Sequence, residues 1–222
     1  MTSTSTRGVT LGQAAREFLR HPTPWMILAL VAGTATARVV VGGIGLADLW
    51  APLALVLLFP FVEWVIHVFI LHWRPRKLGR ITLDTLVARD HRRHHANPRD
   101  VDLVFIPTPT SMWLIAAIVA LPLGIGAAVG APLHATLTFV LIESLVLLTY
   151  EWTHYLVHTD YKPRTTLYKA VWRNHRLHHF KNEHYWFSVT TSGTSDRVLG
   201  TYPDPAAVET SPTAKNLHGS LN

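Results

Sequence analysis

The chain has 222 residues, of which 49% are hydrophobic and only 15% are charged, whereas about 25% of the residues of a typical soluble domain are charged. This length suits one ordinary domain, and the hydrophobic excess indicates a membrane protein. No cysteine is present, which excludes disulfides, thiolate metal sites and cysteine nucleophiles. Any metal ion would need histidine, aspartate or glutamate ligands, and histidine is abundant, with fourteen copies.

Four long apolar segments follow a polar N-terminal segment, residues 1–20, in which residues 11–19 have an amphipathic pattern. A helix that crosses a bilayer needs about 20 apolar residues, and four segments meet that length: 25–44, 49–71, 112–129 and 135–157. Prolines at positions 52, 60 and 122 need not end these helices, because neighbouring helices can satisfy the freed carbonyl groups. The sequence therefore predicts an all-α fold, an integral membrane bundle of four transmembrane helices.

The lysine and arginine residues indicate how this bundle lies in the membrane. Three precede the first apolar segment, eight lie between Arg74 and Arg99, and eight lie beyond Tyr161, whereas the other two connections have none. Positive charge favours the cytosolic side, so we expect a multi-pass protein with both termini and the middle loop in the cytosol. This placement explains the net charge of +6 as a membrane-facing surface, and we expect no nucleic acid partner.

The remaining boundaries follow from composition. Residues 161–202 mix aromatic, basic and histidine residues, and we expect them to complete a cytosolic helical cap. Residues 21–202 would then form the membrane domain. Residues 203–222 are rich in proline, alanine and threonine, which predicts a disordered tail.

Ten of the fourteen histidines fall into four clusters, and the topology places every cluster on the cytosolic side. The clusters are His67 and His72; His91, His94 and His95; His154 and His158; and His175, His178 and His179. Because the topology was derived from lysine and arginine alone, this agreement is independent evidence. Imidazole binds iron, zinc, copper and nickel, and ten ligands suit two ions with five or six ligands each. We therefore predict a dinuclear metal site in the cap.

The spacing within the clusters supports this prediction, except in the pair His67 and His72. Residues three or four apart share a helix face, as in His154 and His158 and within each triple. His67 and His72 are five apart, which is about 140° on an ideal helix of 3.6 residues per turn. They can share a site only if the helix ends between them or the metals lie beside it. Of the other histidines, His21, His134 and His218 are interpreted as isolated, and His184 as a possible ligand or substrate-side group.

Three carboxylates lie beside the clusters: Glu63, Asp90 and Glu151. A ligating histidine commonly donates its second N–H group to a carboxylate, and we expect this supporting role for all three. For Glu151 an alternative is the Glu-x-x-His ligand motif of ferritin-like bundles, which needs two copies, and only one occurs here.

Two further charges, Arg38 and Glu143, lie inside the apolar segments. A lone charge in a bilayer is costly, and pairing is the usual remedy. We predict an ion pair between them, or alternatively that Glu143, which shares a helix face with His154, lines a substrate route.

Longer motifs surround the histidines. The sequence reads DHRRHHANPRD at 90–100 followed by LVFIP, YEWTHYLVH at 150–158, HHFKN at 178–182, FSVT at 187–190 and DRVLGT at 196–201. Residues 63–201 thereby resemble the fatty acid hydroxylase/sterol desaturase superfamily of membrane histidine-motif di-iron oxygenases, and most closely its fatty acid 2-hydroxylase branch.

This resemblance implies that all ten clustered histidines bind two iron ions. Zinc could occupy the same site in purified samples, because imidazole binds both metals. It implies hydroxylation of a lipid acyl chain by O₂, with no catalytic residue beyond the metal centre. No cytochrome b5 domain precedes the motifs in this sequence, so we expect a separate cytochrome b5-like or ferredoxin-like electron donor.

Other functions remain open at this point. A sterol or carotenoid hydroxylase or desaturase of the same superfamily would share the histidine pattern. A metal transporter would need ionisable residues along a route through the bilayer, and a di-haem cytochrome b would need facing histidines on two helices. A zinc hydrolase would need a glutamate base, as in His-Glu-x-x-His, and that motif is absent.

Overall fold

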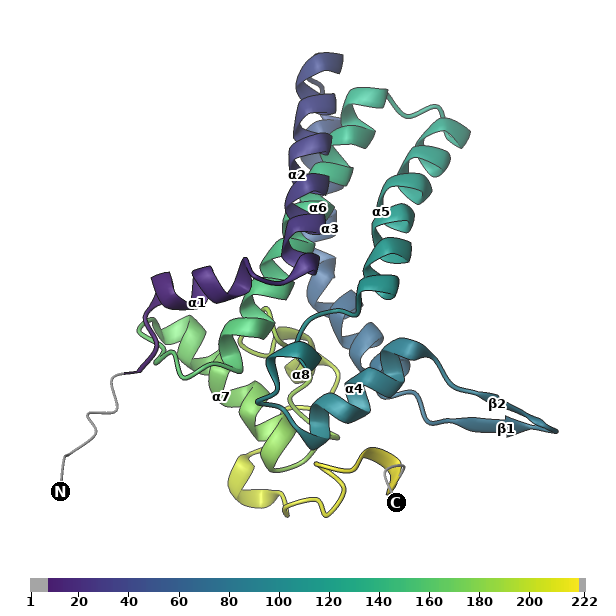
Figure 1. Cartoon of the computed structure of the whole chain (residues 1–222). Helices are drawn as coiled ribbons and strands as arrows, with labels where there is room; N and C mark the ends of the chain where they lie inside the picture. Colours follow the sequence, from purple (N-terminus) through teal and green to yellow (C-terminus); the bar gives the residue numbers. More distant parts are fainter. Residues whose placement is uncertain (1–7, 220–222) are drawn as a thin grey trace.

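The computed structural model describes residues 8–219, and four long helices stand side by side at one end of it (Figure 1). They are α2 (Pro22–Val41), α3 (Ala47–Val65), α5 (Thr108–Ala128) and α6 (Leu133–Val157). Each is long and apolar enough to cross a membrane. The second span comprises α3 and the helical turn that follows it. The prolines at 52, 60 and 122 lie inside α3 and α5 without ending them. The predicted four-helix membrane bundle is therefore confirmed.

Helix α6 is the centre of the bundle and packs against α2, α3 and α5. A buried core between these helices contains Ile27, Ile118 and Val140. The outward faces stay apolar, and the side chains of Val40 and Trp113 are 79% and 80% exposed. Apolar surface on this scale is typical of contact with lipid or with another protein.

The shorter elements form a cap at one end of the bundle, together with one crosswise helix at the foot of α2 (Figure 1). In chain order they are α1 (Leu11–Phe18), a π-helix (Ile66–Leu71), the hairpin β1 (Arg76–Leu78) and β2 (Ile81–Leu83), α4 (Leu86–Ala96), α7 (Thr166–Phe180), α8 (Thr194–Val198), and 3₁₀ turns at Val101–Leu103, Pro205–Ala207 and Leu217–Gly219. Helices α1, α4 and α7 each begin after a threonine whose hydroxyl accepts a backbone N–H of the first turn, at Thr10, Thr85 and Thr165. Such a cap satisfies an N–H group that a helix start leaves unpaired.

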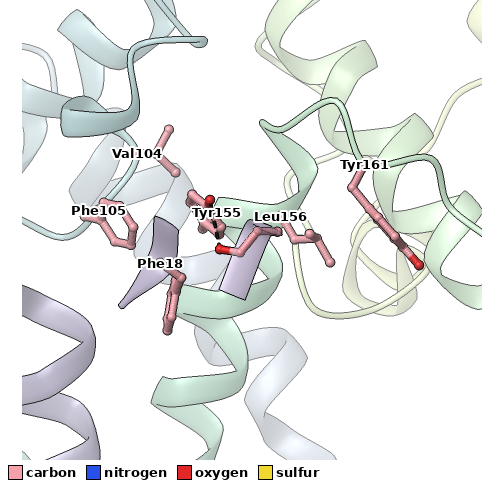
Figure 2. Packing of buried hydrophobic residues seen from close by; sticks show 7 residues of the cluster. Phe18, Val104, Phe105, Tyr155, Leu156 and Tyr161 are labelled. Carbon is pink, nitrogen blue, oxygen red and sulfur yellow. Dashed lines mark hydrogen bonds between the residues drawn. The ribbon is translucent and has the colours of Figure 1, made fainter. Parts of the chain in front are cut away.

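An aromatic cluster fixes α1 against the cap end of α6 (Figure 2). The ring of Phe18 lies 5.7 Å from that of Phe105 and 5.4 Å from that of Tyr155. The hydroxyl of Tyr155 donates a hydrogen bond to the carbonyl of Ala14 at 3.1 Å. Because Tyr155 follows His154 directly, the cluster also fixes the turn of α6 from which the histidines project.

The predicted ion pair between Arg38 and Glu143 is wrong. The Arg38 guanidinium donates to Asp48 at 3.1 Å and to the Thr138 hydroxyl at 2.6 Å. Arg38 lies in the last turn of α2, where a long side chain can extend to the end of the bundle instead of staying at mid-depth. One carboxylate oxygen of Glu143 is buried with no hydrogen-bond partner in the described part of the chain.

The C-terminal segment differs from the disordered tail that composition predicted. Ala214 and Leu217 are 4% and 0% exposed, and the backbone N–H of Ser211 donates to the carbonyl of Lys181 at 2.7 Å. A few anchored residues can order such a segment against the cap even though its composition offers no regular apolar pattern.

Candidate metal centre

The π-helix that continues α3 brings the first two histidines together. In a π-helix each N–H bonds to the carbonyl five residues earlier, and the N–H of His72 donates to the carbonyl of His67 at 3.0 Å. The wider turn places residues five apart on nearly the same face, and the two rings lie 5.1 Å apart. The π-helix also ends at Leu71, directly before His72, so the helix does end between the two histidines, as one of the two expected solutions requires.

The other eight clustered histidines come from three helix ends of the cap. His154 and His158 lie at the end of α6, and the two triples lie at the ends of α4 and α7. The side chains divide into two groups, and within each group the five candidate ligand atoms lie within 4.8 Å of one another. The first group is His67, His72, His91, His95 and His178, and the second group is His94, His154, His158, His175 and His179. The structure thus gathers all ten predicted histidines.

Each triple contributes to both groups. In α4, His91 and His95 join the first group and His94 joins the second, whereas in α7 only His178 joins the first group. Residues four apart therefore stay together, and the third histidine of each triple turns toward the neighbouring group. This crossing holds the two groups side by side, with the rings of His95 and His179 only 4.2 Å apart.

In the first group, backbone carbonyls orient three of the rings. The Nδ1 atoms of His67, His95 and His178 lie 2.7, 3.0 and 2.9 Å from the carbonyl oxygens of Phe187, Ala214 and Tyr185. A carbonyl can only accept, so each Nδ1 carries the proton and each Nε2 keeps its lone pair free. The Nε2 atoms of His67, His72 and His91 are buried without a hydrogen-bond partner among the described residues. Buried lone pairs that converge in this way suit a cation.

In the second group, the Nε2 atoms face one another directly. His158 Nε2 lies 3.2 Å from that of His94 and 2.9 Å from that of His175, and the Nε2 atoms of His175 and His179 are 3.0 Å apart. Imidazole nitrogens bound at about 2.1 Å to one ion, with a right angle between them, lie about 3.0 Å apart. The donor set and spacing fit a metal ion, so both groups could hold one.

Burial keeps these imidazoles neutral, which is the form that binds metal. Eight of the ten are buried, and His72 and His158 are half-buried. Burial lowers the pKa of His95 to about 3, although its hydrogen bond to Ala214 acts in the opposite direction. Burial, with added repulsion from neighbouring imidazoles, also holds the pKa well below the ordinary value of 6.5 for His72, His91, His94, His158, His175, His178 and His179.

These pKa values predict that acid destabilises the metal-free protein. Below pH 6.5 the histidines of the unfolded chain bind protons that the folded chain excludes, so stability is full above pH 6.5 and falls as the pH drops toward the folded-state values. Each such histidine lowers the free energy of unfolding by up to about 1.4 kcal/mol for each pH unit of acidification. Denaturant unfolding of metal-free protein at pH 7.5 and 5.5 should give a smaller free energy of unfolding at pH 5.5. Equal values would show that the imidazoles are not buried as neutral groups.

The three carboxylates do not accept the predicted hydrogen bonds from the histidines. Glu63 accepts hydrogen bonds from the backbone N–H groups of Val189 and Thr190 at 2.7 and 3.0 Å. Glu151 accepts the N–H of Ile106 at 3.1 Å, and Asp90 pairs with Arg93 at 3.1 Å. The expected carboxylate–histidine contacts are replaced by the carbonyl contacts described above. Glu63 acts one step removed, because it fixes the segment that follows Phe187.

Backbone groups and one acid were missed by sequence reasoning. Asp196 is fully buried and accepts the N–H groups of Phe187 and Ser188, each at 2.9 Å. It thereby holds the carbonyl of Phe187 against His67. The motif around Asp196 was visible in the sequence, but a backbone carbonyl has no side-chain signature that could have identified it.

The remaining histidines lie outside both groups. His134 contacts Asp48 at 2.7 Å at the opposite end of the bundle, and His21 stacks on Phe105. The side chain of His184 is 66% exposed, so the structure does not bring it into the centre. His218 was interpreted as isolated, yet its Nε2 lies 2.9 Å from the carbonyl oxygen of His72.

The chain is similar in sequence to known proteins. A dihydroceramide fatty acyl 2-hydroxylase of Arabidopsis thaliana is 28% identical over 154 residues, which cover 67% of this chain and 58% of the plant protein. A fatty acid 2-hydroxylase of Mus musculus is 30% identical over 138 residues, which cover 61% of this chain and 35% of the mouse protein. The chain thus spans about three fifths of the plant relative and about a third of the mouse relative.

The fold also matches a solved structure, described as full-length scs7p with only the hydroxylase domain visible. The TM-score is 0.63 at 18% identity, over 92% of this chain and 70% of that one, which shows a common fold. The family model of the fatty acid hydroxylases matches residues 52–201, a range that contains every histidine of both groups and Glu63, Glu151 and Asp196. The chain belongs to the fatty acid hydroxylase family.

Proposed function

We propose that this chain hydroxylates a lipid acyl chain with O₂ at a centre of two iron ions. One ion is held by the first histidine group and the other by the second group. The main support for this proposal is the pair of adjacent histidine groups at the cap end of the four apolar helices. In each group, five imidazole nitrogens lie within 4.8 Å of one another. In this proposal residues 21–202 form the membrane hydroxylase domain, and the residues after 202 support that domain.

An unactivated C–H bond needs a stronger oxidant than any side chain, and reduced iron with O₂ supplies that chemistry. The chain's own residues hold the ions and exclude water. A small cavity of about 40 Å³ lies beside His91, His94 and His154, and Ile106 and Tyr150 are among its other walls. It has room for little more than a water molecule, so this cavity alone does not hold the end of an acyl chain.

Two further observations support the substrate class and the orientation. The plant and mammalian relatives are named as fatty acyl or fatty acid 2-hydroxylases, which supports an acyl chain as the substrate class. The basic residues gather around the cap end of the chain, which supports a cytosolic cap and cytosolic termini. Each turnover consumes two electrons, for which we propose a separate cytochrome b5-like or ferredoxin-like carrier.

Lipid mass spectrometry tests the proposed function. Cells that express the chain should contain hydroxylated acyl lipids that are missing from cells without it. The matched control is His178→Ala, which removes one member of the first group and should return the lipid profile to that of cells without the chain. The proposal fails if the profile does not change, or if the His178→Ala variant produces the same new lipids.

A further inference from the structure

The segment that follows Thr201 lies beyond the family match, which ends at that residue. It passes along the end of the cap away from the four long helices, where it is drawn in yellow (Figure 1). Three contacts anchor it to the end of α7 and the turn that follows. Ser211 N–H donates to the Lys181 carbonyl at 2.7 Å, the Thr213 hydroxyl donates to Glu183 at 2.5 Å, and the Lys215 ammonium lies 5.3 Å above the ring of Phe180.

The same segment reaches the metal centre at two points. The carbonyl oxygen of Ala214 accepts a hydrogen bond from Nδ1 of His95 at 3.0 Å, and Nε2 of His218 donates to the carbonyl of His72 at 2.9 Å. Between these two contacts lies Leu217, whose side chain is fully buried. His95 and His72 both belong to the first histidine group. The segment therefore supports one group directly.

We propose that residues 211–218 are a positioning segment for the metal ion of the first histidine group. The Ala214 carbonyl keeps the proton of His95 on Nδ1, so that Nε2 presents its lone pair to the ion. His218 fixes the turn at His72, and Leu217 holds both contacts in place. This inference rests on the proposed function in one respect, namely that the first group binds a metal ion.

The contact of Ala214 is a backbone contact, so the test removes the side chains that hold it. Leu217→Ala and Thr213→Val loosen the segment, and Thr210→Ala, at the exposed position directly before the segment, is the matched control. Each purified protein of residues 1–222 is loaded with zinc, and the release of zinc to an excess of chelator is followed. Loss of a group that orients a ligand typically weakens metal binding 10- to 100-fold.

Wild-type protein and Thr210→Ala should hold two zinc ions per chain with the same release rates. In Leu217→Ala and Thr213→Val one of the two ions should leave about 10- to 100-fold faster, whereas the other should leave at the wild-type rate. Unchanged release of both ions would overturn the proposal. Equal acceleration of both ions would also overturn it, because the segment would then hold the whole domain and not one group.

The outcome is separable from the proposed function: a wild-type protein that holds two ions but forms no hydroxylated lipid refutes the enzyme activity and leaves the positioning segment intact.

Discussion

Replacement of His94 or His178 by alanine is expected to abolish lipid hydroxylation while the chain remains inserted in the membrane. His178 belongs to the first histidine group and His94 to the second, so each variant removes a nitrogen from a different ion. Mutation of a residue that only orients a ligand already lowers metal affinity or activity 10- to 100-fold. Mutation of a ligand itself should therefore lower turnover by more than about 100-fold. Turnover is measured as hydroxylated product per chain, and insertion as the amount of chain in the membrane fraction.

Two histidines outside the centre serve as matched controls. His134 contacts Asp48 at the opposite end of the bundle, and the side chain of His184 is largely exposed. His134→Ala and His184→Ala should keep most of the activity. Activity within a few-fold of wild type in both His94→Ala and His178→Ala would refute the assignment of the two groups as the catalytic centre.

Metal removal should have an equally large and reversible effect. Protein stripped by a chelator should lose all turnover, and two Fe(II) ions per chain should restore it under reducing conditions. Zinc also binds imidazole but has no redox chemistry. Two zinc ions per chain should therefore bind, as with iron, but turnover should not return. Metal content by elemental analysis and product by mass spectrometry are measured on the same samples.

The order of loading supplies the control for this experiment. Zinc-loaded protein that is stripped again and given Fe(II) should recover its activity, which separates a blocked site from damaged protein. Turnover with zinc alone, or full turnover after complete removal of metal, would exclude a redox-active iron centre.

Much of the fold followed from simple counts, because a bilayer imposes length and apolarity on each helix. The four predicted segments correspond to the four long helices of the structure. The gathering of the ten histidines also followed, since independent evidence placed all four clusters at the same end. The assignment of each histidine to a group did not follow, because residues of one triple can turn toward different neighbours.

The pairing of His67 with His72 shows why local geometry was harder to predict. Ideal helical pitch separates residues five apart by about 140°, and no residue type marks the π-helix that removes the separation. Arg38 is a similar case, since depth was counted along the helix axis, whereas its side chain reaches Asp48 at the helix end.

The supporting contacts were missed for a different reason. Sequence reasoning assigned the histidine N–H groups to carboxylates, but His67 and His95 bond to the backbone carbonyls of Phe187 and Ala214. Every residue type has such a carbonyl, so only the fold can identify the one that is used. Composition likewise predicted a disordered tail where Leu217 is fully buried.

The origin of the oxygen atom in the product shows whether the chain hydroxylates its substrate with O₂. Iron-loaded protein is supplied with a reductant, an acyl lipid and isotopically heavy O₂ in ordinary water. The mass of the hydroxylated product is then measured by mass spectrometry. The new hydroxyl group should carry heavy oxygen, and heavy water with ordinary O₂ should leave the product unlabelled. A product whose hydroxyl oxygen comes from water would contradict hydroxylation by O₂ and indicate a hydratase or a hydrolase.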